Sequence, residues 1–316
     1  MQAYFPHASR LIYGCMGLGG GWNDSPATQN DVDQARAIVD KVLELNINVF
    51  DHADIYTFGK AEYVFGQVLK QAPSLRENML IQSKCAIRFE DSLGPKRYDF
   101  SAHYIQSSVE GILSRLNIEQ LDILLLHRPD PLMELEEVAG VLQQLQKQGK
   151  IKHVGVSNMH GHQIAYLQSA LDTPIVANQL EMSLAFRDWL EDGITTNSAA
   201  NRQMGYAPGT LEYCMSHKVQ LQAWGSLAQG RYTGAKSDGA HDKATAKLVA
   251  SLAAQYETTP EAIVLAWLMK HPAKIQPVLG STNLSRIEAS QRAMDVTLTR
   301  EHWYLLFETA RGQEMP

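Results

Sequence analysis

Four polar residues stand at or just beyond the ends of three apolar segments, and together they could donate a proton to a carbonyl oxygen. Asp51 and Tyr56 lie five positions apart and follow the apolar run that ends at Phe50. Lys84 and His127 each end a further apolar run. Short apolar runs of this kind are typical of buried strands. Because the C-terminal ends of the strands of a β/α barrel converge on one face, these side chains are predicted to meet there.

A tyrosine next to a lysine can act as a general acid. The free pKa of tyrosine, about 10, makes it a slow acid at neutral pH, and a nearby ammonium lowers that pKa by favouring the phenolate. Lys84 is the candidate for this ammonium, with Asp51 holding it in place. His127 could hold the substrate oxygen by a hydrogen bond. Reduction of a carbonyl also needs hydride, which amino-acid side chains do not supply, so a cofactor is required.

Each of these residues also has a structural interpretation when it is taken alone. A strand-end aspartate such as Asp51 is often a turn residue or a helix cap. Tyr56 alone would be a half-buried loop residue, Lys84 a surface lysine and His127 a loop residue before Arg128. The catalytic interpretation is favoured because all of them stand at the right strand ends.

Asp51, Tyr56, Lys84 and His127 together resemble the catalytic tetrad of the aldo-keto reductases. Further segments agree with this family in their order along the chain: Gly155-Val156-Ser157-Asn158, Asn178-Gln179-Leu180-Glu181, Ala223-Trp224-Gly225-Ser226-Leu227, and Gly280-Ser281 with Arg286. The sequence around the tetrad residues is similar to that of a bacterial branch of the family. The resemblance covers nearly the whole chain. It implies an α/β fold, a single (β/α)8 TIM-barrel domain over residues 1–316 with extra helices late in the chain, which reduces a carbonyl with NADPH.

The resemblance also implies roles for individual residues. Tyr56 would be the general acid, tuned by Lys84 and Asp51, with His127 orienting the substrate. The cofactor residues it implies are Ser157, Asn158 and Gln179 at the nicotinamide carboxamide, Trp224 stacked on the nicotinamide, and Gly225, Ser226, Leu227, Gly280, Ser281, Thr282, Asn283 and Arg286. Turn formation is an equally good explanation of Ser157, and a place in the core is a credible one for Trp224.

Arg286 bears on the choice between NADP and NAD. Its planar fork suits the 2′-phosphate of NADP, and barrels often bind phosphate at a helix N-terminus near the last strands. Gly280 stands where many family members have a lysine that helps to hold this phosphate. Ala289 and Ser290 stand where glutamate and asparagine often flank the adenine. NADPH is therefore expected to be preferred, with NADH possible.

Composition limits the class of protein. The chain has 316 residues, of which 45% are hydrophobic and 20% charged, and this is enough for a large core. A net charge of −6 argues against nucleic-acid binding. The three cysteines are far apart and form no CxxC pair, which suits a reducing compartment. The N-terminus carries no apolar signal segment and no run is long enough for a membrane, so a soluble cytoplasmic protein, a monomer or weak oligomer, is expected.

Strand-like and helix-like segments alternate along the chain, which favours parallel βα units. Strands are predicted at 11–13, 47–51, 79–84, 121–127, 151–156, 174–177, 219–223 and 275–279, and helices at 28–45, about 61–69, 101–116, 135–148 and 260–269. Two additional helical segments are expected late in the chain. The tract 188–208 shows little periodicity and is predicted to be a loop, and long loops without secondary structure are usually functional or mobile. Its role as a lid on the active-site face is a hypothesis.

Loop residues Trp22, Phe58 and Tyr98 are candidates for the substrate pocket, although the substrate itself cannot be named from the sequence. The pair His160 and His162 could suggest a metal, but a helix cap is favoured because a carboxylate at ligand spacing is missing. Two rival functions remain open. One is a barrel that binds nucleotide to sense redox state or regulate a partner, and the other is a metal-dependent hydrolase.

Overall fold

Eight parallel strands form a closed barrel in the computed structural model, which describes residues 1, 4–196, 206–235 and 239–316. Around the barrel the order is β1, β10, β9, β8, β7, β6, β3, β2. Their bounds are β1 Ile12–Gly14, β2 Val49–Asp51, β3 Leu80–Cys85, β6 Leu121–Leu126, β7 Ile151–Ser157, β8 Ile175–Glu181, β9 Gln220–Trp224 and β10 Gln276–Leu279. The predicted α/β TIM barrel is confirmed.

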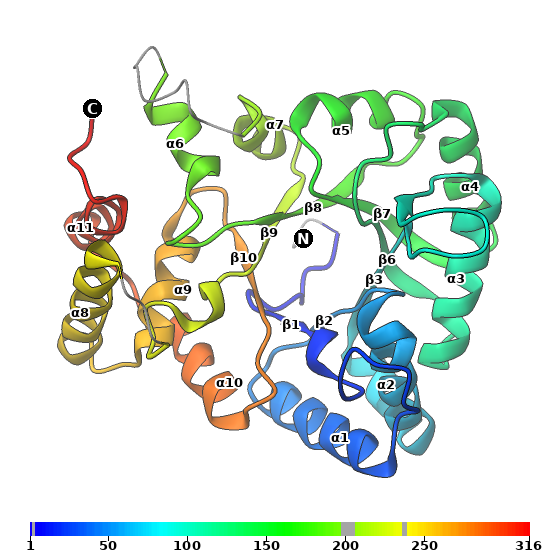
Figure 1. Ribbon diagram of the computed structural model, residues 1–316, viewed down its shortest axis with the longest axis horizontal. Coiled ribbons are helices and arrows are strands. Elements are labelled where there is room, and N and C mark those ends of the chain that lie inside the picture. The colour runs from blue at the N-terminus through cyan, green and yellow to red at the C-terminus, as the bar shows by residue number, and fades with distance from the viewer. Residues whose placement is uncertain (2–3, 197–205, 236–238) are drawn as a thin grey trace. The chain divides into compact units, whose positions relative to one another are not determined.

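The chain divides into two compact units, Met1–Asn178 and Gln179–Pro316, which we describe in turn. In the first unit the helices lie outside the strands that they connect (Figure 1). They are α1 Gln29–Glu44, α2 Lys60–Gln71, α3 Ala102–Leu116, α4 Leu135–Lys147 and α5 Gly161–Gln168, with the short 3-10 helices η1 Cys15–Gly17, η2 Tyr56–Gly59 and η3 Pro73–Asn78.

Local sequence explains where the first helix begins and which face it buries. Thr28 caps α1 in a capping box with Asp31, which satisfies backbone N–H groups that have no partner within the helix. The buried side of α1 consists of Val32, Ala35, Ile38, Val39 and Val42. These residues recur at the spacing of one face of a helix, as in the helix predicted at 28–45.

Strand β6 shows why the barrel wall could be recognised from sequence. All of its residues are buried, as expected of a strand covered on both faces. Its one charged member, Asp122, accepts hydrogen bonds from Arg76, Lys152 and the Ile81 N–H. A buried carboxylate is tolerated when it is paired in this way.

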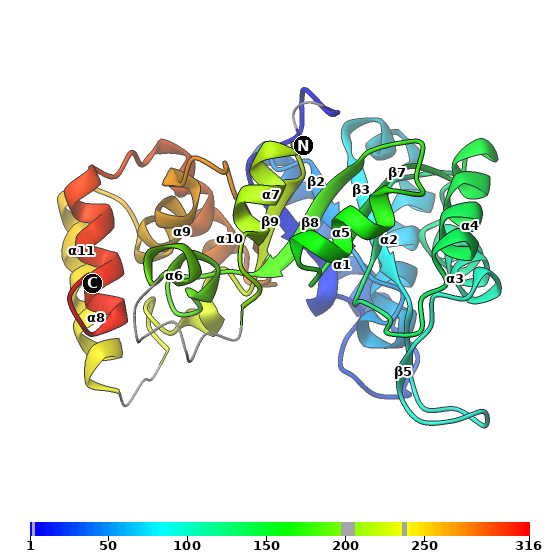
Figure 2. The same ribbon diagram turned by 90° about the horizontal axis from the view of Figure 1, so that it is seen from above.

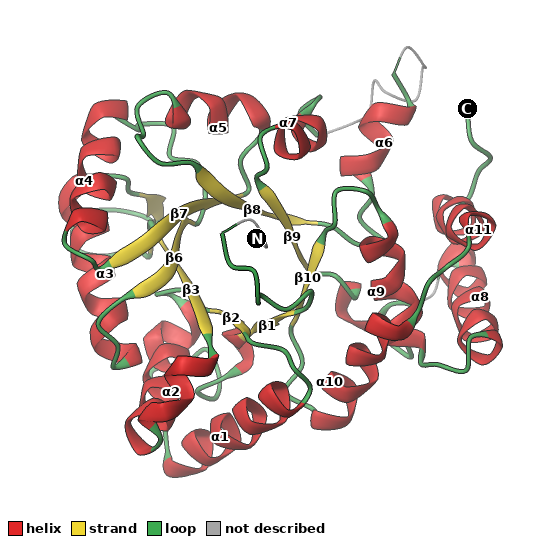
Figure 3. Cartoon of the chain, turned by 180° about the vertical axis from the view of Figure 1, so that it is seen from behind, coloured by secondary structure: helices red, strands yellow, loops and turns green. Residues whose placement is uncertain are grey.

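The second unit holds β9, β10 and the late helices. The helices are α6 Asp188–Ile194, α7 Thr210–Ser216, α8 Ala240–Gln255, α9 Pro260–Lys270, α10 Leu284–Gln291 and α11 Arg300–Arg311, with the 3-10 helices η5 Ala228–Gly230 and η6 Arg292–Asp295. Helices α8 and α11 lie side by side (Figure 3). The helix predicted at 260–269 is α9. Pro260 opens it and Thr259 caps it, the Thr259 hydroxyl accepting from the Ala262 N–H at 3.2 Å.

The structure differs from the predicted loops at Tyr98, which lies in a strand, and at the start of the tract 188–208. A β-hairpin, β4 Ile87–Arg88 with β5 Arg97–Tyr98, follows β3 and extends away from the barrel strands of its unit (Figure 2). Residues 188–194 of the tract predicted to be a loop form helix α6, because Trp189 is buried and orders that segment. The rest of this prediction falls largely on residues 197–205, which lie outside the described part of the chain. Among the described residues, no helix is long and apolar enough to cross a membrane.

Candidate active site

The ammonium of Lys84 connects three groups in the first unit. Lys84 lies one residue before the end of β3 and is fully buried. Its Nζ donates hydrogen bonds to Asp51 Oδ2 at 2.7 Å, to the carbonyl oxygen of His52 at 2.8 Å and to the hydroxyl of Tyr56 at 2.9 Å. Burial opposes the charged form, but Asp51 and Tyr56 outweigh it and raise the pKa of Lys84. Lys84 is therefore a cation at neutral pH.

Asp51 ends β2 and is fixed at both of its oxygens. Oδ2 accepts from Lys84, and Oδ1 accepts from Nε2 of Gln82 at 2.6 Å. Gln82 is buried and lies two residues before Lys84 on β3, so both side chains point to the same face of the strand. Gln82 was not among the predicted site residues, although its spacing of two from Lys84 places it on the same face of the strand.

Tyr56 opens the short helix η2, the next element along the chain after β2. The Nζ of Lys84 lies 4.8 Å from the centre of its ring. Burial raises the pKa of Tyr56 above its ordinary value, and the Lys84 ammonium acts in the opposite direction without cancelling it. Lys84 thus acts in the expected direction, but desolvation is the larger effect and leaves the pKa of Tyr56 above that of free tyrosine.

Tyr56 sits in an unusual backbone turn. Thr57, Phe58 and Gly59 follow it with φ of 48°, 59° and 83°, all in the left-handed region. Non-glycine residues in this region cost roughly 1–2 kcal/mol each, so surrounding contacts must hold the turn. One such contact is the Thr57 hydroxyl, which donates to the carbonyl oxygen of Leu18 at 3.0 Å.

His127 follows β6 and faces Tyr56, with the two ring centres 6.1 Å apart and the rings nearly perpendicular. Burial, Lys84 and two further cations lower the pKa of His127 well below its usual value, so its imidazole is neutral at neutral pH. Its Nδ1 is buried and has no hydrogen-bond partner among the described residues. A neutral imidazole keeps one N–H to donate, and this is the form needed to hold a carbonyl oxygen.

Two residues predicted at the nicotinamide lie beside His127. Ser157 is the last residue of β7 rather than a loop residue, and it is buried. Asn158 follows with φ of 58°. Its Nδ2 donates to the carbonyl oxygen of His127 at 3.1 Å and to Ser157 Oγ at 2.8 Å. The first unit thus brings Ser157 and Asn158 next to the tetrad.

The second unit holds the remaining cofactor candidates. Gln179 lies within β8 rather than after it, and its Nε2 donates to Oε1 of Gln222 at 3.0 Å. Trp224 ends β9 and is half-buried. After Gly225, Ser226 is buried and its hydroxyl donates to the carbonyl oxygen of Val278 on β10 at 2.9 Å. This bond fixes the segment that ends with the half-buried Leu227.

Arg286 lies in the first turn of α10, as predicted. Asn283 caps this helix, its Oδ1 accepting from the Arg286 N–H at 3.1 Å, and Ser281 Oγ accepts from the Asn283 N–H at 3.2 Å. The Arg286 side chain is 46% exposed, and its Nε lies 3.7 Å from Oε1 of Glu261. A pair this long and exposed holds the arginine weakly.

The loop that precedes α10, the helix carrying Arg286, has open space at Gly280. Gly280 is exposed, and a β-carbon built there meets no described heavy atom within 4 Å. Thr282 is half-buried between Ser281 and Asn283. An exposed guanidinium at a helix N-terminus is suited to bind a phosphate.

An aromatic row lies beside the Tyr56 turn. The rings of Trp22 and Phe58 are 5.5 Å apart and those of Phe58 and Phe89 5.4 Å apart. Trp22 and Phe58 are about half exposed, at 48% and 49%. Phe89 was missed by our sequence analysis, because the hairpin that carries it was not predicted. Tyr98 lies on the same hairpin, opposite Ile87, and is exposed.

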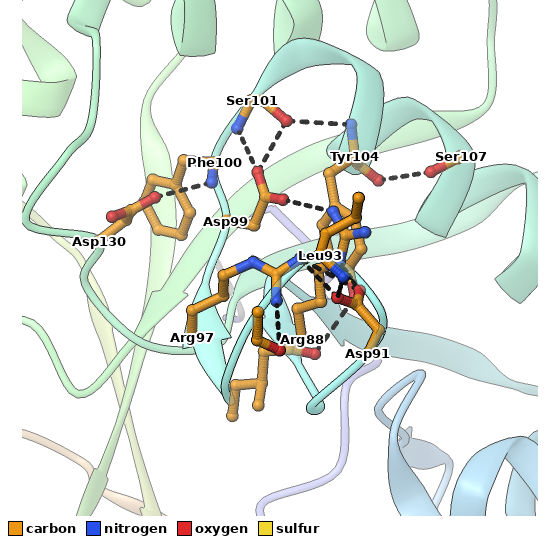
Figure 4. Close-up of polar contacts among 12 residues, drawn as sticks. Arg88, Asp91, Leu93, Arg97, Asp99, Phe100, Ser101, Tyr104, Ser107 and Asp130 are labelled. Atoms are coloured by element: carbon orange, nitrogen blue, oxygen red, sulfur yellow. Dashed lines mark hydrogen bonds and ion pairs between the residues drawn. The ribbon is translucent and has the colours of Figure 1, made fainter.

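A network of ion pairs orders that hairpin (Figure 4). Arg88 contacts Asp91 at 2.7 Å and Asp99 at 3.0 Å, and Arg97 contacts Asp91 at 3.1 Å. Desolvation works against the ionised carboxyl of Asp91, but the hydrogen bond from the Leu93 N–H and the two guanidiniums outweigh it and hold its pKa at about 2. These contacts fix the segment between Phe89 and the start of α3.

His160, which could have suggested a metal site with His162, caps α5. Its Nδ1 accepts from the Gln163 N–H at 3.3 Å, and the Gln163 side chain accepts from the His160 N–H in return. This is a capping box. Across the described residues, no three His, Cys, Asp or Glu side chains are grouped so that they could hold a metal ion.

Comparisons with known proteins agree on one family. The sequence matches the Aldo/keto reductase family over residues 10–309. It is 35% identical to a 6-dehydroglucose reductase of Agrobacterium fabrum, over 97% of this chain and 96% of that protein. It is 33% identical to the oxidoreductase YdhF of Escherichia coli, over 98% and 96%. The fold is similar to that of the thermostable aldo-keto reductase Tm1743, with a TM-score of 0.75, 23% identity and 95% of both chains covered.

Proposed function

Because the chain belongs to the aldo/keto reductase family, we propose that it reduces an aldehyde or ketone to the alcohol with NADPH, and that Tyr56 donates the proton. Enzymes of this family use NAD(P)H on small carbonyl compounds. The observation that carries the proposal is the contact of Lys84 Nζ with both Asp51 and the hydroxyl of Tyr56.

The raised pKa of Tyr56 bears directly on its role. At neutral pH the phenol carries its proton, as a general acid must before the reaction. As negative charge develops on the substrate oxygen, the proton moves from the Tyr56 hydroxyl to that oxygen. The phenolate left behind is stabilised by the ammonium of Lys84, 2.9 Å away, which Asp51 holds in place. General acid catalysis of this kind contributes about 10²–10⁴-fold to the rate.

We assign His127 to the orientation of the substrate. Its imidazole is neutral, so it can donate a hydrogen bond to the carbonyl oxygen without competing for the proton of Tyr56. Asn158 supports it by donating to its backbone carbonyl oxygen. When bound, NADPH supplies the hydride. Ser157, Asn158 and Gln179 would hold its carboxamide and Trp224 would stack on the nicotinamide.

For the 2′-phosphate of NADP we propose Arg286, supported by its weak pairing and its exposure. Gly225, Ser226 and Leu227, together with the segment Gly280, Ser281, Thr282 and Asn283, would contact the rest of the cofactor. The open space at Gly280 leaves room for the phosphate but supplies no cation. NADPH is therefore proposed as the preferred cofactor. Its advantage in affinity over NADH is expected to be smaller than it would be with a second cation at the 2′-phosphate.

The aromatic row of Trp22, Phe58 and Phe89 offers an apolar surface next to the Tyr56 turn. We propose that this surface, with Tyr98, contacts the part of the substrate that carries the carbonyl. The relative in Agrobacterium fabrum is named for the reduction of 6-dehydroglucose, so this sugar aldehyde belongs in any substrate panel beside aryl and alkyl aldehydes.

We further propose a single domain over residues 1–316 and a reducing, cytoplasmic location. The location is supported by Cys15, Cys85 and Cys214, which are buried and form no disulfide within the described part of the chain. A monomer or weak oligomer acting on a small-molecule substrate is the expected working form.

The experiment that tests the proposed function is a panel of aldehydes and ketones, with NADPH consumption followed by absorbance. Turnover of at least one carbonyl that depends on Tyr56 supports the proposal. Tight NADPH binding with no turnover across the panel would instead favour a nucleotide-binding regulatory barrel.

A further inference from the structure

A carboxylate on the outer side of the barrel wall connects the two segments that carry Tyr56 and Lys84. Glu62 lies in the first turn of α2, which begins where the Tyr56 turn ends at Gly59. Its side chain is fully buried. Oε1 of Glu62 accepts from the Ser83 hydroxyl at 2.6 Å, and Oε2 accepts from Nε of Arg115 at 2.8 Å.

Ser83 and Lys84 are neighbours on β3, so their side chains point to opposite faces of the strand. Lys84 points to the face where Asp51 and Tyr56 lie. Ser83 points to the other face, toward α2. Through Ser83, Glu62 therefore holds the strand that carries the ammonium without facing the reacting groups.

Arg115, on α3, holds the Tyr56 turn from the same side. A β-carbon at Gly59 would lie 3.1 Å from Cδ of Arg115, so the guanidinium stem packs directly against the end of the turn. A β-carbon at Gly66 of α2 would overlap the carbonyl oxygen of Arg115. The backbone of α3 is thus packed closely against α2, the helix that carries Glu62.

The charges of this cluster are not balanced one to one. The guanidinium of Arg115 acts to lower the pKa of two carboxyl groups, those of Glu62 and Asp54. Burial first, and the charge of Glu62 second, raise the pKa of Asp54 to about 7. Asp54 lies two residues before Tyr56, and its N–H donates to the carbonyl oxygen of Lys84 on β3 at 3.0 Å. The turn and β3 are therefore joined at Asp54 as well as through Glu62.

We propose that Glu62 is a positioning residue for proton transfer: with Ser83 and Arg115 it fixes the distance between the Tyr56 hydroxyl and the Lys84 ammonium from the outer side of the barrel wall. This inference rests on the proposed role of Tyr56 as the acid. Left-handed residues at Thr57 and Phe58 make the turn costly to hold. When its anchor is removed, the turn relaxes and the hydroxyl of Tyr56 moves relative to Lys84.

The variants that test this inference are Glu62→Gln, Ser83→Ala and the pair Arg115→Lys and Arg115→Met. Asp40→Asn is the matched control, because Asp40 forms an exposed pair with Arg36 on α1. A misplacement of about 1 Å can cost about 100-fold in rate, so we expect kcat to fall roughly 10-fold to 100-fold in Glu62→Gln. The dissociation constant for NADPH should stay within about two-fold of the parent's. Arg115→Lys should retain more kcat than Arg115→Met.

Ser83→Ala keeps the test valid if Glu62→Gln fails to fold, because Ser83→Ala removes only one hydroxyl and leaves the Glu62–Arg115 pair. It should lower kcat in the same direction as Glu62→Gln. Unchanged kcat in both variants would overturn the inference. So would a fall in kcat matched by an equal loss of NADPH affinity, because that pattern belongs to a general loss of structure.

A readout independent of turnover separates this inference from the proposed function. The ring ¹³Cζ signal of Tyr56 can be assigned by its disappearance in Tyr56→Phe. It should shift in Glu62→Gln and Ser83→Ala and stay in place in Asp40→Asn. If the parent reduces no carbonyl, the proposed function fails, and the Tyr56 signal still decides whether Glu62 positions the hydroxyl. A signal that stays unmoved in both variants refutes the positioning role.

Discussion

The hydroxyl of Tyr56 accepts a 2.9 Å hydrogen bond from the ammonium of Lys84, a residue 28 positions further along the chain. Burial and this ammonium act on Tyr56 in opposite directions, and burial is the larger effect, so the pKa of the phenol lies above its ordinary value. The acid is therefore protonated at rest, and Lys84 is in place to stabilise the phenolate once the proton has left. This pair is the reason to expect acid catalysis from the site.

Tyr56→Phe should lower carbonyl reduction by about 10²–10⁴-fold, since it removes the proton donor and leaves the ring in place. NADPH binding, measured by fluorescence titration, should persist because the phenol is not proposed to hold the cofactor. Near-parental turnover would remove Tyr56 from the mechanism.

Arg286→Ala should weaken NADPH more than NADH. A hydrogen bond to a charged group is worth about 1.5–3 kcal/mol, which corresponds to a loss of roughly ten-fold or more in affinity. Titration of both cofactors measures the difference, with Lys243→Ala as the control for loss of an exposed cation in the same unit. Equal weakening of both cofactors would show that Arg286 does not read the 2′-phosphate.

Gly280→Lys should tighten NADPH binding by roughly ten-fold and change NADH binding little. The position is exposed and a β-carbon there meets no described heavy atom within 4 Å, so the longer side chain can be accommodated. The added cation would share the 2′-phosphate with Arg286. Cofactor titrations of the parent and the variant test this directly. An equal gain in NADH affinity would show that the added lysine contacts the pyrophosphate, which both cofactors have, instead of the 2′-phosphate.

Phe89→Ala should raise KM for aryl aldehydes more than for small aliphatic ones, because it removes the end of the aromatic row next to Phe58. Aromatic pairs are worth about 0.5–1.5 kcal/mol, so a change of about three-fold to ten-fold is expected. Tyr166→Ala, which removes an exposed aromatic side chain from α5, is the control. The same KM for both substrate classes would exclude Phe89 from the pocket.

The hairpin should loosen at acid pH. Asp91 and Asp99 have lowered pKa values in the folded protein, that of Asp91 being about 2. Such groups bind fewer protons when folded, so the stability they contribute is present above the ordinary carboxyl pKa of about 4 and is lost as pH falls toward about 2. The protection factors of the hairpin amides, which compare hydrogen exchange with that of an unstructured chain at the same pH, should therefore fall on acidification in the parent.

In Asp91→Asn the hairpin amides should already be weakly protected at neutral pH, and their protection should depend less on pH. The control Asp24→Asn, which changes an exposed carboxylate elsewhere in the unit, should match the parent. If protection of the hairpin amides in the parent does not change with pH, the ion pairs of the hairpin do not order it.

Local sequence was enough to predict the strands of the barrel and most residues of the tetrad. Buried strands are short apolar runs whose ends carry polar residues, and the barrel topology brings those ends to one face. This is why Asp51, Lys84 and His127 could be selected before any coordinates. Helix starts such as Thr28 and Thr259 were equally visible, because a cap depends on neighbours three residues away.

Tertiary structure decided what no local pattern contains. The hairpin that carries Phe89 is stabilised by Arg88 and Asp99, which pair across eleven positions, and helix α6 forms where composition indicated a loop. The direction of the Tyr56 pKa depends on burial by the whole fold, which outweighs the one charge that sequence spacing could identify. The link from Glu62 to Ser83 and Arg115 joins three separate elements, because close packing brings together side chains 21 and 53 positions apart.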